Sequence, residues 1–261
     1  MPEVCPICEG SGFRLVEIDS VRFAEDCVCR VHFRVERNLL QARIPPRYAM
    51  CSLGSFDYDF ADEKLSKAFL LCHSFATKYP SDTRGRGLLF SGPVGLGKTH
   101  LAISILKYVV THRAATGYFW EHKELLDKLR SFYDGRVAGA EDKLLRSVIT
   151  CDLLVLDDLG DLTPSDWTWD TTSYILNSRY NENRSTIITT NLPNEMNFQA
   201  REGEESSRLG EIRKAMRRET LGDRIGERMR SRLQEMCVVV EMQGEDYRQR
   251  AKRASFSNSL L

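Results

Sequence analysis

The stretch that most constrains the fold is 87–101, GLLFSGPVGLGKTHL, which contains the pattern G-x-x-x-x-G-K-T. An apolar run precedes the pattern and a helix-like segment follows it, which is the context that a phosphate-binding loop requires. Glycines let backbone N–H groups point inward onto a polyphosphate, and the helix N-terminus adds partial positive charge. The sequence therefore predicts a site for ATP. The residues expected to contact the nucleotide are Gly92, Pro93, Val94, Gly95, Leu96, Gly97, Lys98, Thr99 and His100.

Two side chains of this loop have distinct chemical tasks. Lys98 can reach the β- and γ-phosphates as a positive charge, and the Thr99 hydroxyl can take one coordination position on Mg²⁺.

A second feature of the sequence is a pair of carboxylates, Asp157 and Asp158, at the end of the apolar run Asp152-Leu-Leu-Val-Leu-Asp-Asp158. A strand buried on both faces reads as a continuous apolar run, and ligands of open parallel sheets bind at the carboxyl ends of the strands. We expect Asp157 to hold Mg²⁺, usually through water, and Asp158 to orient and deprotonate the attacking water. A plain strand and turn is the alternative. Because Asp158 is one methylene shorter than the Glu that is common at this position, a low basal rate of hydrolysis is expected.

A third strand, Ser185 to Asn191, is β-branched and ends in an amide. Asn191 is then placed beside the γ-phosphate, where it can position the water; the alternative is an ordinary turn before Leu-Pro. The further strands expected are 88–90, 117–121 and 237–242, and the helices expected between them are 98–112, 123–132, 141–149 and 167–180. This alternation predicts an α/β fold with a parallel sheet.

Four of the eight cysteines are grouped near the N-terminus, in C-P-I-C and C-V-C. Two close pairs of thiolates can surround Zn²⁺ tetrahedrally, so Cys5, Cys8, Cys27 and Cys29 are predicted to hold a structural zinc. The intervening residues alternate as in a small hairpin, and so few residues need a metal to fold. The alternatives are reduced thiols or a redox pair, and His32 as a substitute ligand. The other cysteines are scattered singly and are expected to be buried thiols.

The C-terminal part has a row of arginines. One helix is expected from Asp223 to Met236, with an apolar stripe that faces the core. Arg224, Arg228 and Arg232 would lie on its exposed flank, either as salt-bridged surface or as fingers for a neighbouring subunit's site. Arg248 could fold back on the phosphates of its own chain.

Composition restricts the partners. The chain of 261 residues has 37 Lys plus Arg and 37 Asp plus Glu, so its overall charge attracts neither nucleic acid nor an anionic membrane. No apolar run approaches the roughly 20 residues that span a bilayer, and a soluble cytoplasmic protein is expected. The mixed charges of residues 195–222 suit a solvated helical face or mobile loop, with nucleic-acid contact as the alternative.

Five segments together, GPVGLGKTHLA, LLVLDDLG, TTN, LGDRIGERMRSRL and GEDYR, resemble the AAA+ ATPases of the DnaC/DnaI helicase-loader and IstB transposition-ATPase group. The resemblance covers roughly residues 44 to 250 and implies a three-layer αβα core without a full C-terminal helical lid. It makes residues 92–99 the Walker A motif, Asp157 and Asp158 Walker B, and Asn191 sensor 1. Arg228 falls where the group has its arginine finger, and Arg248 on its sensor 2.

By this resemblance, residues 1–43 form a zinc-binding, partner-docking module with a linker helix, and residues 44–261 an AAA+ ATPase domain. The expected function is loading of a replicative hexameric helicase onto single-stranded DNA by an ATP-dependent homo-oligomer. The alternative is an IstB-like regulator that binds duplex DNA and recruits a transposase. A P-loop kinase for small molecules and an ATP-bound scaffold that scarcely turns over are further alternatives.

Overall fold

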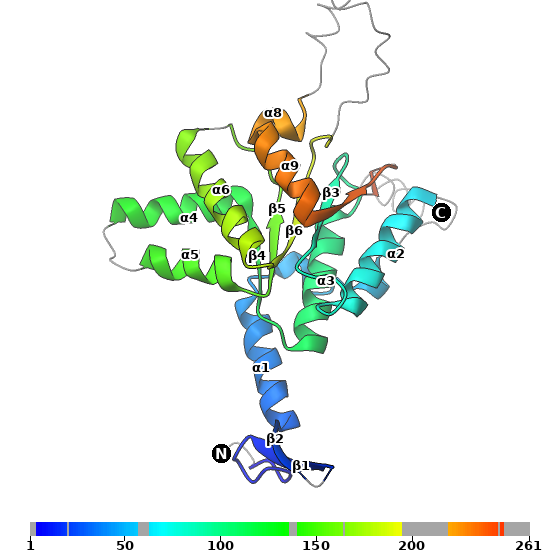
Figure 1. Cartoon of the computed structure of the whole chain (residues 1–261). Coiled ribbons are helices and arrows are strands. Elements are labelled where there is room, and N and C mark those ends of the chain that lie inside the picture. The colour runs from blue at the N-terminus through cyan, green and yellow to red at the C-terminus, as the bar shows by residue number, and fades with distance from the viewer. Residues whose placement is uncertain are drawn as a thin grey trace, which may run out of the picture.

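The computed structural model describes residues 4–19, 21–56, 63–135, 140–163, 165–194, 219–244, 246 and 247. The core of the molecule is a five-stranded, wholly parallel sheet with the strand order β4-β5-β6-β3-β7 (Figure 1). Its strands are β3 (Gly87–Ser91), β4 (Gly117–Glu121), β5 (Leu153–Asp157), β6 (Ser185–Thr190) and β7 (Cys237–Glu241). The parallel sheet predicted from the alternation of elements is confirmed.

Side chains alternate between the two faces of this sheet. Leu88 and Phe90 of β3 belong to one apolar cluster, and Leu89 between them belongs to a second. The first cluster is covered by α2 (Glu63–Lys78) and α3 (Lys98–Arg113) and by the end of α1 (Val28–Gln41). The second is covered by α4 (His122–Gly135), α5 (Ala140–Thr150), α6 (Asp166–Asn181), α8 (Leu221–Ile225) and α9 (Glu227–Met236). The result is a three-layer αβα sandwich, as expected.

Two short 3-10 helices, η1 (Pro46–Tyr48) and η2 (Leu53–Ser55), join α1 to the core. Ser165 caps helix α6, since its side chain accepts a hydrogen bond from the Thr168 amide. No helix in the described part of the chain is long and apolar enough to cross a membrane.

The cysteine-rich N-terminal residues form a hairpin, β1 (Phe13–Ile18) and β2 (Val21–Asp26), at the far end of α1 (Figure 1). The other end of α1 is fixed to the core, because the buried Asn38 amide donates to the carbonyls of Ala114 and Ala115 at 3.1 and 3.0 Å. The predicted hairpin is confirmed. Helix α1 is the expected linker helix.

The single helix expected over residues 223–236 is wrong. Gly226 has φ 81° and ψ 144° and separates α8 from α9. Thr220 caps α8, because its hydroxyl accepts from the Asp223 amide and the Asp223 carboxylate accepts from the Thr220 amide. The apolar stripe is nevertheless buried as expected; its members are Ile225, Met229, Leu233 and Met236.

Candidate functional site

The loop between β3 and α3 has the backbone shape that phosphate binding needs. Gly92, Gly95 and Gly97 have φ values of 146°, 84° and 82°, a region that residues with a Cβ rarely adopt. Gly97 directly precedes α3, so the amides at the helix N-terminus face the loop with the positive end of the helix dipole. This loop can therefore hold an anion with several charges.

Lys98 lies inside this loop. Its side chain is only 6% exposed, and its Nζ donates to the carbonyl oxygens of Gly92 and Pro93 at 2.7 and 2.6 Å. The ammonium group is therefore held at the loop, within reach of a phosphate.

The side chains of three elements meet at Asp157, the last residue of β5. The Thr99 hydroxyl donates to Asp157 Oδ1 at 2.9 Å, and the Thr189 hydroxyl of β6 donates to the same oxygen at 2.6 Å. The pKa of Asp157 is raised to about 6, chiefly by burial; the charge of Asp158 adds to the rise, and the two hydroxyl donors oppose it. A buried, partly protonated carboxylate beside a threonine hydroxyl is a donor set that suits Mg²⁺, whose charge would hold the carboxylate ionised.

Asp158 and Asn191 lie together, directly after the neighbouring strands β5 and β6. The Asn191 side-chain amide donates to Asp158 Oδ1 at 3.1 Å, and the Asp158 backbone amide donates to Thr189 Oγ1 at 2.9 Å. Asp158 has φ 55°, a left-handed conformation in which Asp is among the better tolerated residues. The half-buried carboxylate and the amide can together orient a water molecule, and assigning them to that role stays a prediction.

The side chains of the other loop residues lie outside the phosphate cradle. His100 turns toward the segment before α2, where its Nδ1 lies 3.3 Å from Cys51 Sγ and its Nε2 lies 3.3 Å from Ser55 Oγ. Leu96 is buried in the core, and Val94 is exposed. Any contact of these residues with phosphate would therefore come from the backbone.

The three arginines expected to form one exposed row, Arg224, Arg228 and Arg232, differ in their surroundings, which corrects that expectation. Arg224 donates to the Leu162 carbonyl at 3.1 Å and pairs with Glu219 at 2.6 Å. Arg232 donates to the Asn177 side chain. Arg228 is exposed and has no hydrogen bond or ion pair within the described residues. Arg248 and residues 195–218 lie outside the described residues.

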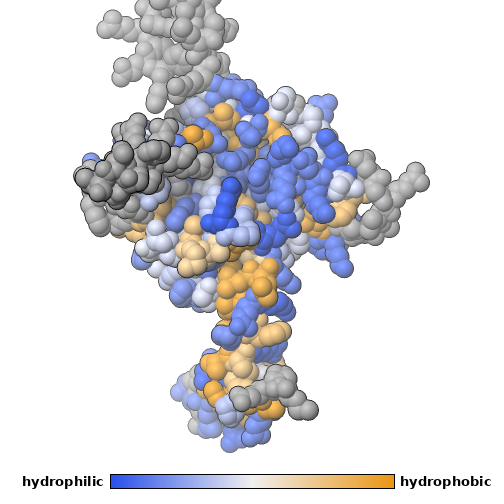
Figure 2. Space-filling view, turned by 180° about the vertical axis from the view of Figure 1, so that it is seen from behind, coloured by the Kyte–Doolittle hydropathy of each residue, from blue (hydrophilic) through white to orange (hydrophobic). Residues whose placement is uncertain are grey.

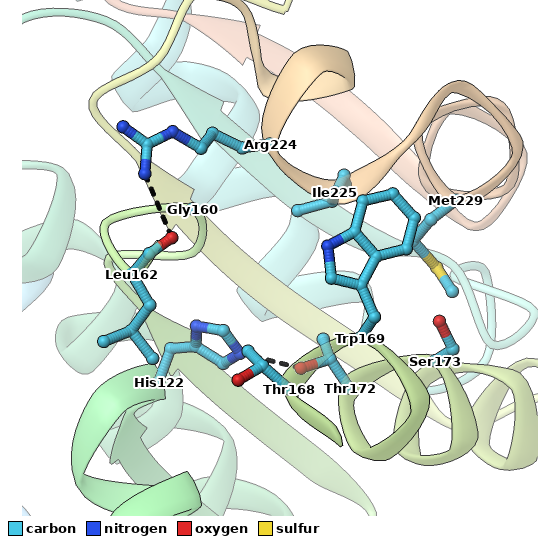
Figure 3. Close-up of a pocket in the computed structure, with 10 residues that line it drawn as sticks. All are labelled: His122, Gly160, Leu162, Thr168, Trp169, Thr172, Ser173, Arg224, Ile225 and Met229. Atoms are coloured by element: carbon cyan, nitrogen blue, oxygen red, sulfur yellow. Dashed lines mark hydrogen bonds between the residues drawn. The ribbon is translucent and has the colours of Figure 1, made fainter. Parts of the chain in front are cut away.

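A small pocket lies beneath these helices, next to the turn that follows Asp158 (Figure 3). The residues that line it are His122, Gly160, Leu162, Thr168, Trp169, Thr172, Ser173, Arg224, Ile225 and Met229. His122 Nε2 lies 2.9 Å from Thr172 Oγ1, and burial lowers the pKa of His122 to about 4. None of the residues that line the pocket belongs to the phosphate loop. The pocket lies where α6 packs against α8 and α9.

The four N-terminal cysteines converge on one point. Their sulfur atoms all lie within 4.8 Å of one another, with 3.9 Å between Cys5 and Cys27 and 3.5 Å between Cys8 and Cys29. Tetrahedral zinc with Zn–S bonds of about 2.3 Å requires sulfurs about 3.8 Å apart. His32 lies outside this group, exposed and 3.6 Å from Glu36. The four residues therefore fit a zinc ion.

Local structure explains the convergence. The hairpin brings its two ends together, and the Cys27 amide donates to the Gly12 carbonyl at 2.9 Å. The Gly12 amide donates to Cys8 Sγ at 3.3 Å, and this bond lowers the pKa of Cys8 to about 6. The neighbouring Cys8 raises the pKa of Cys29 to about 12. Four thiolates at this spacing repel one another, so they need a cation between them to ionise together.

The sequence reasoning missed two residues of the site. Thr189 donates to Asp157 and accepts from the Asp158 amide. Its only sequence signal is a polar β-branched residue at the end of a buried strand. Asp246, which lies against the phosphate loop, had no recognisable signal.

Comparisons with known proteins point to one group of ATP-binding proteins. Residues 16–205 match the family described as IstB-like ATP binding protein. An insertion-sequence ATP-binding protein of Sinorhizobium fredii is 32% identical over 167 residues, 63% of this chain and 51% of the relative. The replicative helicase loader DnaC of Buchnera aphidicola is 24% identical over 159 residues, 61% of this chain and 63% of the relative. The chain thus matches less than two thirds of the length of either.

A solved structure gives the same indication. The crystal structure of the DnaC helicase loader superposes with a TM-score of 0.59 at 31% sequence identity, covering 76% of this chain and all of that one. The fold and the group of proteins are thereby shown, and this chain resembles both helicase loaders and insertion-sequence ATP-binding proteins.

Proposed function

The chain belongs to the family of IstB-like ATP-binding proteins, within the AAA+ group that includes the DnaC helicase loaders, and on that premise we propose that it is an ATPase that binds a replicative helicase and loads it onto single-stranded DNA. The proposal has two parts, an ATP-driven core and a docking module. Each part is supported by separate features of the molecule.

The core contains what ATP hydrolysis needs from one subunit. The loop amides and Lys98 would bind and orient the phosphates, while Thr99 and Asp157 would hold Mg²⁺, which when bound neutralises the charge that develops on the phosphates. Asp158 and Asn191 would orient the attacking water, and Asp158 would accept its proton.

Arg228 suggests why the core would work as an oligomer. Unlike Arg224 and Arg232, Arg228 is exposed and has no hydrogen bond or ion pair within the described residues. An arginine supplied to a neighbouring subunit's phosphates accelerates phosphoryl transfer by about 10³ to 10⁵. A homo-oligomer that forms with ATP is therefore part of the proposal, and Arg248 is proposed as the corresponding residue acting within its own chain.

The observation that carries the loader function is the surface of the N-terminal module, including α1, the stem that joins the hairpin to the core. Of the fifteen large apolar side chains exposed in the described part of the chain, nine lie between residues 4 and 40. Figure 2 shows apolar side chains along the stem and on the module below the core. Exposed apolar groups at this density are typical of a protein-binding surface.

The charged residues of the module favour a protein over a nucleic acid as its partner. Four of its six arginines pair with its own acids: Arg14 with Glu25, Arg22 with Glu17, and Arg30 and Arg34 with Asp26. A nucleic acid would need free positive charge. We therefore assign the module to the helicase and leave DNA to the core.

The test is size-exclusion chromatography with light scattering of the protein and its own organism's replicative helicase, with Mg²⁺·ATP and without nucleotide. We expect a complex that Phe23→Ser, at a side chain 51% exposed on the module, weakens at least tenfold, as expected for a large apolar side chain at the centre of an interface. Leu70→Ser, 63% exposed on the core, is the matched control and should bind normally. If no complex forms, the loader function is wrong.

The second candidate is a regulator of transposition that binds duplex DNA and recruits a transposase. The family match and the Sinorhizobium fredii relative favour it. It is expected to show oligomerisation on duplex DNA with ATP and no complex with the helicase. Hydrolysis that ignores DNA entirely would instead favour a small-molecule kinase.

A further inference from the structure

The chain after β7 crosses the phosphate loop. The Met242 amide donates to the Ser91 carbonyl at 2.8 Å, and the Tyr247 amide donates to the Gly95 carbonyl at 3.1 Å. These two bonds hold Met242 beside the end of β3 and Tyr247 beside Gly95 of the loop. Asp246, which directly precedes Tyr247, is therefore brought close to the loop.

Asp246 is the acidic side chain that this crossing brings onto the loop. A Cβ added at Gly95 would lie 2.0 Å from Asp246 Oδ1 and 2.7 Å from Oδ2, so the carboxylate rests directly against the glycine. The close approach gives Gly95 a second reason to lack a side chain, beyond its φ of 84°.

A carboxylate at this place opposes the ligand for which the loop is shaped. The loop glycines, the α3 N-terminus and Lys98 all favour negative charge, whereas Asp246 repels it. The repulsion grows with the charge of the ligand, and a divalent cation bound to the phosphates reduces that charge. A fixed carboxylate beside the loop therefore penalises free ATP more than its magnesium complex.

We propose that Asp246 determines nucleotide affinity and selectivity at this site, weakening polyphosphate binding and making the loop prefer the metal-bound nucleotide. The inference rests on the proposed ATP site and adds a residue to it. A purely structural Asp246 is the competing explanation, because Asp246 also interacts with other residues of the protein.

The experiment is calorimetric titration of the full chain with ATPγS, in Mg²⁺ and in EDTA. For Asp246→Asn we expect Kd to fall roughly tenfold in EDTA and roughly threefold in Mg²⁺. Changes of this size are expected when one charge several ångström from the ligand is removed, at an effective dielectric between that of a protein surface and that of water. The preference of the protein for the metal complex should fall accordingly. Asp246→Glu, which keeps the charge, should retain that preference.

The control for net charge is Asp127→Asn, an exposed residue of α4 that pairs with Lys123 and should leave both constants unchanged. Weaker binding by Asp246→Asn in both buffers, or an unchanged preference for the metal complex, would overturn the inference. Failure of the unmodified protein to bind ATPγS at all would instead reject the proposed ATP site.

Discussion

At the scale of single residues, Asp157 shows a conflict between stability and function. Its carboxylate is 3% exposed, and burial holds its pKa at about 6 against an ordinary value of 3.8. The folded state therefore binds this proton more tightly than the unfolded state does. The stabilising contribution of the proton is complete below pH 3.8 and is lost as the pH rises through 6.

The first prediction is that Asp157→Asn stabilises the protein without nucleotide at pH 7, by about 1 to 3 kcal/mol, because the neutral amide avoids burying a charge. The gain should vanish near pH 4, where the carboxyl group of the unmodified protein is protonated. Urea unfolding at both pH values measures it. Added Mg²⁺·ATP should then stabilise the unmodified protein alone, and a variant that unfolds more easily at pH 7 would contradict the argument.

Asp158 illustrates how a residue choice depends on the backbone. Its φ of 55° lies in the left-handed region, where Asp and Asn are enriched several-fold among residues other than glycine. A shorter acid is thus compatible with this turn, and Asn191 at 3.1 Å holds it in place. The sequence predicted both residues but could not show the strained backbone that favours Asp over Glu.

At the scale of elements, Gly226 fixes the direction of the helix that presents Arg228. A Cβ at this glycine would lie 2.2 Å from Cη2 and 2.4 Å from Cζ3 of Trp169, on a backbone with φ 81°. The ring lies in the wall of the pocket between α6 and α9 (Figure 3), so it has little room to move. The break between the helices is therefore set by one contact.

The second prediction concerns this glycine. Gly226→Ala should destabilise the fold by about 1 to 3 kcal/mol, through a strained backbone and displacement of Trp169, and should also lower ATP turnover by tilting α9. Arg228→Ala should lower turnover with no change in Tm, since its side chain is exposed. Gly54→Ala is the control, because its Cβ would meet only Ser52 Oγ at 4.0 Å. Thermal unfolding and hydrolysis rates distinguish these cases, and a Gly226→Ala protein with normal Tm would refute the argument.

The strands and the phosphate loop could be predicted from the sequence, whereas the break between α8 and α9 could not. Buried strands and the loop glycines were readable because periodicity and motif spacing are local. The break at Gly226 was not, since isolated glycines are tolerated in helices and the cause here is a ring more than fifty residues away. Nor could the pattern show that Arg179 is fully buried, donating from Nη1 to the carbonyls of Val148 and Cys151 at 2.8 and 2.9 Å. Tertiary contacts decided both.

At the scale of the whole molecule, the N-terminal module is built differently from the core. Among the described side chains from residue 4 to 37, only Cys8 and Cys27 are buried, and both belong to the cysteine cluster. The hairpin has no apolar core of its own, and the charged pairs across its strands are exposed and contribute little. We therefore expect a metal ion held by the cysteine cluster to stabilise it.

The third prediction follows from this division. Removal of zinc with a chelator should unfold residues 4–27 and abolish helicase binding, because zinc supplies roughly 10 to 16 kcal/mol in small modules of this kind. The core should keep its Tm and its affinity for ATPγS, since its two apolar clusters include none of the four cysteine ligands. Hydrogen exchange measured peptide by peptide resolves the two regions. Protection of the hairpin that survives chelation, in protein shown by metal analysis to be free of zinc, would mean that the module folds without an ion.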